Sequence, residues 1–271
     1  MLASLSSSFR ERVVLVTGGT MGVGLATALA FAERGASCWL TYRWGSADEE
    51  EVRARFAALG APPPRLVLAD ASRDDDTDAL LAEMRASHAR VDVLVSNVSG
   101  APVVNDLGDY STRALFKSID YSAWPLVAYT RRIKSAFGCY PRYVVGMSST
   151  GVDSFSVGYD FVAASKSVLE TLCRYLNYRL FDEDVRVNVI RSRSVRTASF
   201  DAHFGSQFGA FAGRFTREHH FMQAEEVART VVALCSGLMD GVSGQVLTVD
   251  RGTTFFDNLM RLYDERDELG L

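Results

Sequence analysis

A glycine-rich turn near the start of the chain carries the clearest chemistry in the sequence. It follows the apolar run at 13–16 and reads Thr17, Gly18, Gly19, Thr20, Met21, Gly22, Val23 and Gly24. Glycines let the backbone turn sharply and approach a pyrophosphate, and the helix that follows presents free N–H groups and the positive end of its dipole. Because the turn lies between a strand and a helix, we expect it to bind the pyrophosphate of a dinucleotide. A tight turn without a ligand is the alternative.

The end of the second apolar run indicates which dinucleotide binds. Folds that bind NAD usually place an acidic residue there for the ribose 2′-hydroxyl, but this chain has no acid before Asp48. Arg43 instead offers a guanidinium that suits a 2′-phosphate, and Ser46 adds a hydroxyl. We therefore expect NADP(H), with NAD(H) as the alternative cofactor. A solvated surface arginine is the other interpretation of Arg43.

Short apolar runs alternate with amphipathic stretches along the chain. The seven runs that predict strands are 13–16, 37–41, 66–69, 91–95, 143–145, 185–190 and 245–249. The six stretches with helical periodicity are 22–34, 49–58, 75–89, 112–137, 161–181 and 224–238. Nearly continuous apolar character is typical of strands covered on both faces, and alternation of strands and helices predicts a parallel sheet. We expect an α/β fold, a doubly wound seven-stranded parallel sheet with helices on both faces, in a single domain over 1–271.

The segment from 198 to 222 interrupts this alternation. It has no strand pattern, but phenylalanines recur at three-, four- and six-residue steps with glycines between them. The phenylalanines are Phe200, Phe204, Phe208, Phe211, Phe215 and Phe221. Their spacing predicts one or two short amphipathic helices, which the glycines weaken. Two interpretations stay open: a satellite of the hydrophobic core, or a mobile lid whose Phe200, Phe204 and Phe208 cover an apolar or aromatic substrate.

The composition argues against several other classes of protein. The 271 residues carry a formal net charge of −4 and no basic run, so neither nucleic acid nor an anionic membrane is an expected partner. No apolar stretch approaches the roughly 18–20 residues of a membrane span. The first nine residues lack the basic flank and apolar core of a signal peptide. Four scattered cysteines and four histidines show no ligand spacing, so we expect no metal and a reduced, cytoplasmic protein.

These motifs, taken in order, resemble the short-chain dehydrogenase/reductase family. The spacing Thr-Gly-x3-Gly-x-Gly is typical of that family, Asp70 matches its adenine-contacting aspartate, and the segments 92–100 and 242–252 match its fourth and last strands. The resemblance implies a Rossmann-type fold, an NAD(P)H-dependent oxidoreductase, and a homodimer or homotetramer paired through the fourth and fifth helices. It also implies cofactor contacts from Asp70, Ala71, Asn97, Val98, Ser99, Lys166, Val195 and Thr197.

The resemblance implies a catalytic tyrosine and lysine, usually with a serine, the lysine holding the nicotinamide ribose and lowering the tyrosine pKa. Lys166 is the only lysine in the right region. The commonest tyrosine position, four residues earlier, holds Val162, but Tyr159 lies seven residues earlier. Seven residues are almost two helical turns, so we expect Tyr159 on the same helix face as Lys166, about 10 Å along the axis. Ser149 stands at the spacing of the ketoreductases' catalytic serine.

Tyr-x6-Lys is the spacing of the enoyl-acyl-carrier-protein reductase branch of the family, which the segment 195–198 also resembles. We therefore expect reduction of a C=C bond conjugated to a carbonyl, on a small-molecule or acyl-carrier-linked substrate such as an enoyl thioester or natural-product intermediate of fatty acid or polyketide biosynthesis. Ser149 keeps open the reduction of a polyketide-like or aromatic ketone.

Departures from the family pattern leave a third hypothesis open, a non-catalytic dinucleotide-binding protein. Arg193 stands after the sixth predicted strand, where proline and glycine are usual, and Arg251 replaces a glycine after the last. Arg193 either contacts a pyrophosphate or an anionic substrate group, or lies in an exposed polar loop.

Overall fold

The computed structural model describes residues 8–43, 48–197, 200 and 204–270. In this part of the chain seven strands form one parallel sheet in the order β3-β2-β1-β4-β5-β6-β7. The strands are β1 (Val13–Thr17), β2 (Ser37–Tyr42), β3 (Arg65–Leu68), β4 (Val93–Ser96), β5 (Tyr143–Ser149), β6 (Arg186–Ser192) and β7 (Val246–Val249). The chain runs outward from β1 to β3 and then from β4 to β7 on the other side, which confirms the predicted doubly wound, Rossmann-type sheet.

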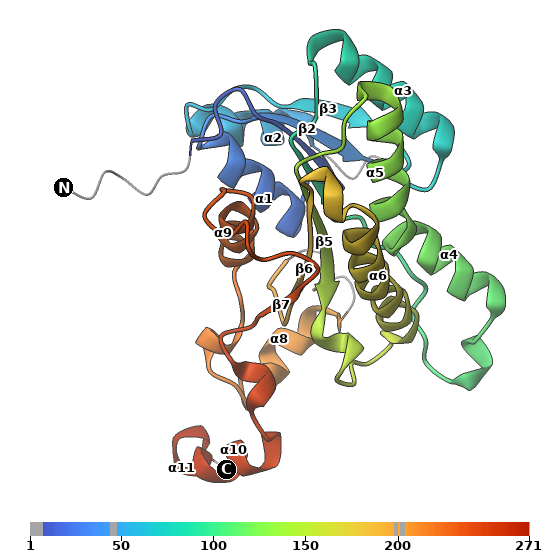
Figure 1. Cartoon of the computed structure of the whole chain (residues 1–271). Coiled ribbons are helices and arrows are strands. Elements are labelled where there is room, and N and C mark those ends of the chain that lie inside the picture. Colours follow the sequence, from blue (N-terminus) through green and yellow to red (C-terminus); the bar gives the residue numbers. More distant parts are fainter. Residues whose placement is uncertain (1–7, 44–47, 198–199, 201–203, 271) are drawn as a thin grey trace.

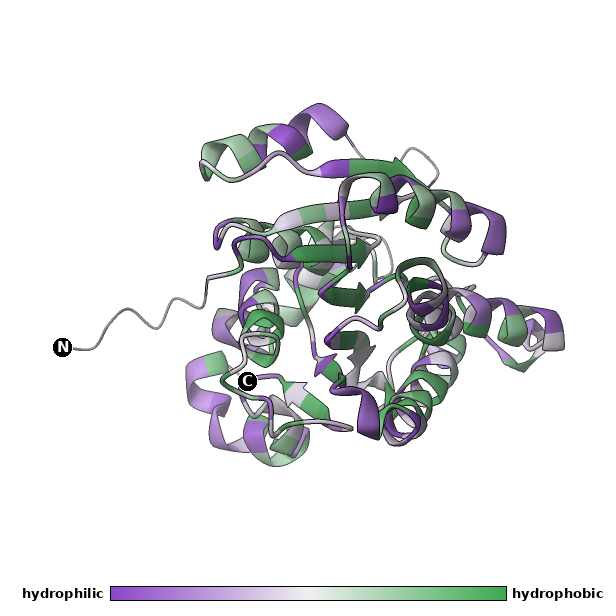
Figure 2. Cartoon of the chain, turned by 45° about the horizontal axis from the view of Figure 1, so that its top comes forward, coloured by the Kyte–Doolittle hydropathy of each residue, from purple (hydrophilic) through white to green (hydrophobic). Residues whose placement is uncertain are grey.

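Helices cover both faces of this sheet (Figure 1). Those on one face are α1 (Gly22–Ala32), α2 (Glu49–Ala58) and α9 (Ala224–Leu234), and those on the other are α3 (Asp74–Ser87), α5 (Trp124–Phe137) and α6 (Asp160–Arg179). Successive side chains of a strand point to opposite faces. In β1, Val14 and Val16 therefore join the first group of helices, and Val13 and Leu15 join the second. Figure 2 shows the result, hydrophobic strands enclosed between helices with polar outer surfaces.

The single helix predicted over 112–137 is two helices, and that prediction was wrong. Helix α4 (Thr112–Ser122) ends before Ala123, and α5 begins at Trp124. Pro125 lies in the first turn of α5, where its missing N–H costs nothing. A continuous helix would need that N–H and would bring the proline ring against the preceding turn. Helix α4 therefore turns away from the sheet and packs on α6.

Short helices complete the chain. They are η1 (Leu107–Asp109), η2 (Thr150–Val152), η3 (Phe181–Glu183), α8 (Ser206–Ala212), η4 (Glu218–His220), η5 (Thr253–Phe255), α10 (Asn258–Asp264) and α11 (Arg266–Leu269). The last two project from the body of the molecule, below α8 in Figure 1. The side chain of Arg261 in α10 holds them there by donating a hydrogen bond to the Phe215 carbonyl oxygen at 2.7 Å.

The backbone at Arg251 bears on one departure from the family pattern. Arg251 has a left-handed φ of 56°, which explains why glycine is usual at that place in the resembled family. Its guanidinium pairs with Glu226 at 2.6 Å.

The limits of a single domain over 1–271 stay a prediction, because 1–7 and 271 lie outside the described residues. Within the described residues, no helix is both long enough and apolar enough to cross a membrane.

Candidate active site

A cavity of about 1240 Å³ opens at the carboxyl ends of the strands. In an open parallel sheet, ligands bind at this edge, beside the point where the strand order reverses. The predicted site residues that line it are Gly18, Met21, Gly22, Val23, Arg43, Asp70, Ala71, Asn97, Val98, Ser99, Ser149, Tyr159, Lys166, Arg193, Val195, Thr197, Phe200, Phe204 and Phe208. Thr17, Gly19 and Gly24 lie outside the lining, and Ser46 lies outside the described residues.

The glycine-rich turn between β1 and α1 is closed by contacts that leave no room for side chains. Gly18 has a left-handed φ of 61°, and a Cβ on Gly24 would lie 2.3 Å from the carbonyl oxygen of Gly18. Asn97, just after β4, donates its side-chain amide to the carbonyl oxygens of Gly18 at 2.9 Å and Thr17 at 3.2 Å. Thr17, Gly24 and Asn97 therefore fix the turn, which brings the N-terminus of α1 to the cavity.

Arg43 and Asp70 form an ion pair at the ends of β2 and β3. The Tyr121 hydroxyl of α4 contacts both side chains, and the Arg43 guanidinium lies 5.3 Å from the centroid of the Tyr121 ring. Asp70 also accepts hydrogen bonds from the backbone and hydroxyl of Ser72, at 3.0 and 2.7 Å. The sequence predicted separate contacts from Arg43 and Asp70 to a cofactor. The sequence did not predict that the two side chains neutralise each other or that Tyr121 contacts both. The three residues are far apart in the sequence, and only the fold brings them together.

Tyr159 and Ser149 meet across the loop between β5 and α6. Tyr159 is the residue before α6, so its expected place on the helix itself was wrong; Gly158, with a φ of 66°, turns the chain there. The Tyr159 ring packs on Gly151, where a Cβ would lie 2.6 Å from the nearest ring atom. Its hydroxyl is hydrogen-bonded to Ser149. Sequence reasoning missed Gly151, whose lack of a side chain makes room for the ring.

Burial dominates the electrostatics of the tyrosine and the lysine. It raises the pKa of Tyr159, although the hydrogen bond from Ser149 acts to lower that pKa. Desolvation of the phenolate therefore outweighs the hydrogen bond, and the expected lowering of this pKa by Lys166 stays a prediction. Lys166 is 4% exposed, and burial lowers its pKa from 10.5 to about 8. Within the described residues, no carboxylate forms an ion pair with its ammonium group.

Apolar side chains form the outer part of the cavity. The rings of Phe200, Phe204 and Phe208 pack on one another, with centroids 4.7 to 5.5 Å apart. Phe155 and Val157, in the loop before Tyr159, line the same space and are exposed to solvent. The sequence predicted the first three residues but not these two, although an apolar pair in a polar loop was a visible signal.

Two basic residues of the lining differ in their contacts. Arg193 donates a hydrogen bond to the Thr253 carbonyl oxygen at 2.9 Å, so it ties the C-terminal segment to the cavity wall. Lys117, in α4, was missed as a site residue, although it is one of only three lysines in the chain. It offers an exposed cation at the cavity for an anionic group of a ligand.

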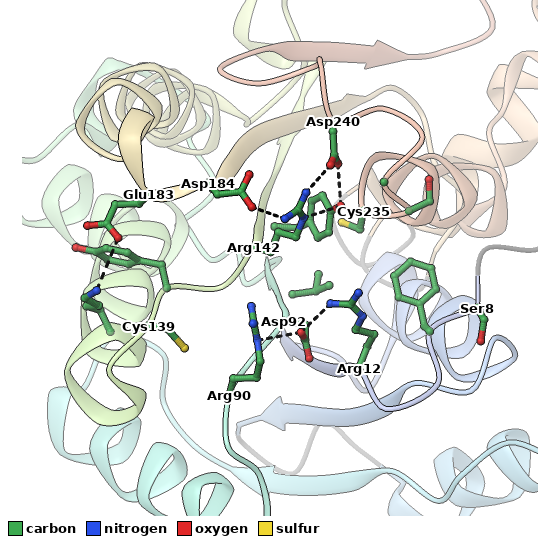
Figure 3. A pocket seen from close by; sticks show the side chains of 17 residues that line it. Ser8, Arg12, Arg90, Asp92, Cys139, Arg142, Glu183, Asp184, Cys235 and Asp240 are labelled. Atoms are coloured by element: carbon green, nitrogen blue, oxygen red, sulfur yellow. Dashed lines mark hydrogen bonds and ion pairs between the residues drawn. The ribbon is translucent and has the colours of Figure 1, made fainter.

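A second cavity, of about 470 Å³, lies at the amino ends of the strands (Figure 3). None of the predicted site residues lines it. Its basic side chains are all paired, in Arg12–Asp92, Arg90–Asp92, Lys134–Glu183, Arg142–Asp184 and Arg142–Asp240. Neither here nor elsewhere in the described part of the chain do three or more histidine, cysteine or acidic side chains gather as metal ligands do.

The fold and the grouping of a tyrosine, a lysine and a serine at its ligand-binding edge define a short-chain dehydrogenase/reductase, a class of oxidoreductases. The chain belongs to the family described as Enoyl-(Acyl carrier protein) reductase, whose sequence model matches residues 18–254.

Similar proteins were found both by sequence and by structure, and the solved structures support the fold. The chain is 26% identical over 263 residues to the enoyl-acyl-carrier-protein reductase (NADH) FabI of Aquifex aeolicus, covering 94% of each chain. It is also 26% identical to a glucose and ribitol dehydrogenase homolog of Oryza sativa, covering 91% of this chain and 87% of that one. A levodione reductase structure matches with a TM-score of 0.81 at 21% identity, over 92% of this chain and 100% of that one. A 7α-hydroxysteroid dehydrogenase matches with a TM-score of 0.79, also at 21% identity, over 93% and 98%.

Proposed function

We propose that this protein is an NADP(H)-dependent reductase of a C=C bond conjugated to a carbonyl, with Tyr159, Lys166 and Ser149 as its catalytic residues. The proposal depends mainly on the contact between Tyr159 and Ser149 in the cavity that also holds the buried Lys166. The match to the Enoyl-(Acyl carrier protein) reductase family and the name of the Aquifex aeolicus relative favour C=C reduction.

The residues of the cavity fit a nicotinamide dinucleotide. The Gly18–Gly24 turn leaves the N-terminus of α1 open to a pyrophosphate. The buried ammonium of Lys166 suits the hydroxyls of a ribose, because a buried cation needs acceptors. Arg43, at the end of β2, supports NADP(H), and the Aquifex aeolicus relative, named for NADH, supports NAD(H) as the alternative. When bound, the reduced nicotinamide supplies a hydride.

The side chains of the chain itself stabilise charge on the substrate oxygen. Reduction of a conjugated C=C bond develops negative charge on the carbonyl oxygen, so the site needs a donor aimed at that atom. The Tyr159 hydroxyl is that donor in our proposal. The hydrogen bond from Ser149 acts to lower the pKa of Tyr159. In our proposal the positive charge of Lys166 also acts to lower this pKa, because it stabilises negative charge on the phenol oxygen.

The outer cavity supports a substrate with an extended apolar part. Phe200, Phe204 and Phe208 on the segment after β6, and Phe155 and Val157 on the loop after β5, line the outer cavity. Apolar surface of this kind binds acyl chains or rings by excluding water. Phe200, Phe204 and Phe208 therefore act as a substrate lid in our proposal.

Reduction of a ketone is the second candidate, and Ser149 favours it because this residue stands at the spacing of the ketoreductases' catalytic serine. In that reaction the charge develops on an alkoxide oxygen, and Tyr159 gives up its proton to it as a general acid. The same three residues serve both reactions, so the position of the reducible bond in the bound substrate decides between them.

Oxidation of NADPH and of NADH with a small panel of substrates tests the proposal. The panel contains a crotonyl thioester, a cyclic enone and an aromatic ketone, and NMR of the product distinguishes a saturated carbonyl compound from an alcohol. We expect the saturated carbonyl compound from the thioester or the enone. An alcohol from the ketone alone would establish the second candidate. Cofactor binding without oxidation by any member would leave a non-catalytic dinucleotide-binding protein.

A further inference from the structure

A buried carboxylate lies one helical turn after Lys166 in α6. Glu170 of α6 has a side chain only 5% exposed. It accepts a hydrogen bond from the Ser148 hydroxyl at 2.6 Å and from Arg191 Nε at 2.9 Å, and a second guanidinium nitrogen of Arg191 completes a bidentate pair. A buried charge is stable only when it is paired and hydrogen-bonded, so these contacts hold the Glu170 side chain in one place.

The Arg191 guanidinium reaches a second carboxylate. Its remaining terminal nitrogen pairs with Asp153, which lies just after η2 in the loop between β5 and α6. Arg191 therefore bridges a buried group in α6 and an exposed group in that loop, from its own position in β6. Ser148 is the residue opposite Arg191 in the pairing of β5 with β6.

Each element that Arg191 joins carries one of the proposed catalytic residues. Ser149 follows Ser148 at the end of β5. Lys166 precedes Glu170 by one turn of α6, which puts both on the same buried face. Tyr159 ends the loop that holds Asp153.

The bridge itself has no access to a ligand. Neither Arg191, Glu170 nor Asp153 lines the cavity. If these three residues affect the reaction, they must therefore do so through the residues that line the cavity.

We propose that Arg191 is a positioning residue, whose pairing with Glu170 and Asp153 holds the loop after β5 so that Tyr159 stays in contact with Ser149 on the side of Lys166. The inference rests on the proposed function of these three residues. It also requires the arginine in particular, since only a guanidinium offers enough donors in one plane to bind two carboxylates.

The first test releases the loop and leaves the buried pair intact. Asp153→Asn removes the charge of an exposed side chain, and Asp184→Asn is the control, since Asp184 is similarly exposed and pairs with Arg142 and Arg186 at the opposite edge of the sheet. We expect Asp153→Asn to lower kcat about fivefold, with an unchanged KM for NADPH and the same Tm as Asp184→Asn. A merely structural ion pair would lower Tm or leave kcat unchanged.

The second test removes the bridge without leaving a buried charge. In the double variant Arg191→Met with Glu170→Gln the buried site is neutral, so we expect the fold to persist while kcat falls at least tenfold. Arg191→Lys keeps the charge but reaches one carboxylate, so its kcat should lie between those of the wild type and the double variant. A wild-type kcat in Asp153→Asn and in the double variant would overturn the proposal.

An assay without substrate separates this inference from the proposed function. The ten tyrosines are labelled with ¹³C at Cζ, and the signal of Tyr159 is assigned with Tyr159→Phe. Because the hydrogen bond from Ser149 lowers the Tyr159 pKa, we expect that pKa to rise in both Asp153→Asn and the double variant. An unchanged pKa in both would overturn the positioning role, whether or not the protein reduces any substrate in the panel. Failure of the proposed function shows instead as a wild-type protein that is inactive with every substrate.

Discussion

Two cavities that contain charged side chains lie at opposite edges of one sheet, and these charges are arranged in different ways. At the amino ends of the strands each of the four basic side chains has a carboxylate partner, as for Arg12 and Arg90 with Asp92. At the carboxyl ends the buried ammonium of Lys166 has no carboxylate partner within the described residues, and the partly buried phenol of Tyr159 lies in the same cavity. A counter-charge offsets the desolvation of a buried charge, whereas a desolvated cation without one lowers stability and is typical of functional sites.

The topology of the sheet explains why the two edges differ. At the carboxyl ends, the chain leaves the strands through turns that reach the N-termini of helices, where backbone N–H groups are free to bind an anion. At the amino ends, helices finish and their carbonyl groups face outward. The edge of the sheet thus decides which cavity suits a dinucleotide, and the following predictions test that distinction.

Replacement of the phenol should have the largest effect. We expect Tyr159→Phe to lower kcat about a thousandfold, because loss of a donor to the developing oxyanion costs factors of that order, with little change in cofactor binding. Tyr140→Phe is the matched control, since Tyr140 lines the cavity at the opposite edge. Steady-state oxidation of NADPH measures both. Equal rates in the two variants would contradict the assignment of chemistry to the carboxyl edge.

Removal of the buried cation should lower activity and raise stability together. In Lys166→Met we expect kcat to fall at least a hundredfold and cofactor binding to weaken. At pH 7 the unfolding free energy of the free chain should rise by up to about 3 kcal/mol, because the Lys166 pKa is lowered to about 8 and a tenfold change in acidity equals about 1.4 kcal/mol.

The pH dependence of this gain has a definite sign. Between pH 8 and 10.5 the unfolded chain binds more protons at Lys166 than the folded chain, so wild-type stability rises through that window and the gain from Lys166→Met fades. Chemical denaturation at several pH values measures it. Lys134→Met, a change at the opposite edge, should show neither the gain nor the loss of activity. A destabilised Lys166→Met would mean that the ammonium is compensated in the free chain.

At the amino edge, we expect a substitution to lower stability and to leave activity unchanged. Asp92 is buried and accepts hydrogen bonds from the backbone N–H of Val13 at 2.9 Å and from Arg12 at 3.1 Å. We expect Asp92→Asn to lower the unfolding free energy by about 2 kcal/mol, since it weakens charge-assisted bonds in a buried place. Urea unfolding gives the free energy, and kcat should stay at the wild-type value. A large fall in kcat would show that the two edges are coupled.

The smallest effect concerns the choice of cofactor. We expect Arg43→Ala to raise the KM for NADPH about tenfold and to change the KM for NADH less than twofold, because only NADPH carries a 2′-phosphate that the guanidinium can bind. Arg90→Ala, at the amino edge, should change neither. An equal rise for both cofactors would mean that Arg43 serves only to hold Asp70.

Periodicity was enough to predict the sheet but not the details of the helices. Strands such as β1 are apolar on both faces, so the local pattern already predicts a parallel sheet that is covered on both faces. The break between α4 and α5 depends on Pro125, whose effect a periodic apolar pattern over 112–137 concealed. Tyr159 likewise keeps its spacing to Lys166 but falls one residue before α6, since helix ends depend on local backbone angles more than on side-chain period.

Pairings between distant residues could not be predicted from spacing. Arg43 with Asp70 and Tyr121, and Arg191 with Glu170 and Asp153, each join elements that are far apart in the sequence. Their partners are selected by distance in the folded chain, and a single sequence contains no measure of that distance.

Residue types and their spacing were enough to predict the class of fold, the glycine-rich turn and the proposed catalytic residues, because these depend on patterns along the chain. Packing of distant segments, in contrast, sets which charges are neutralised, how far Tyr159 and Lys166 are buried, and which edge of the sheet holds a cation without a carboxylate partner in the described chain. The reason is that electrostatic energy depends on the surrounding dielectric and on distance, and both are set when remote segments pack together.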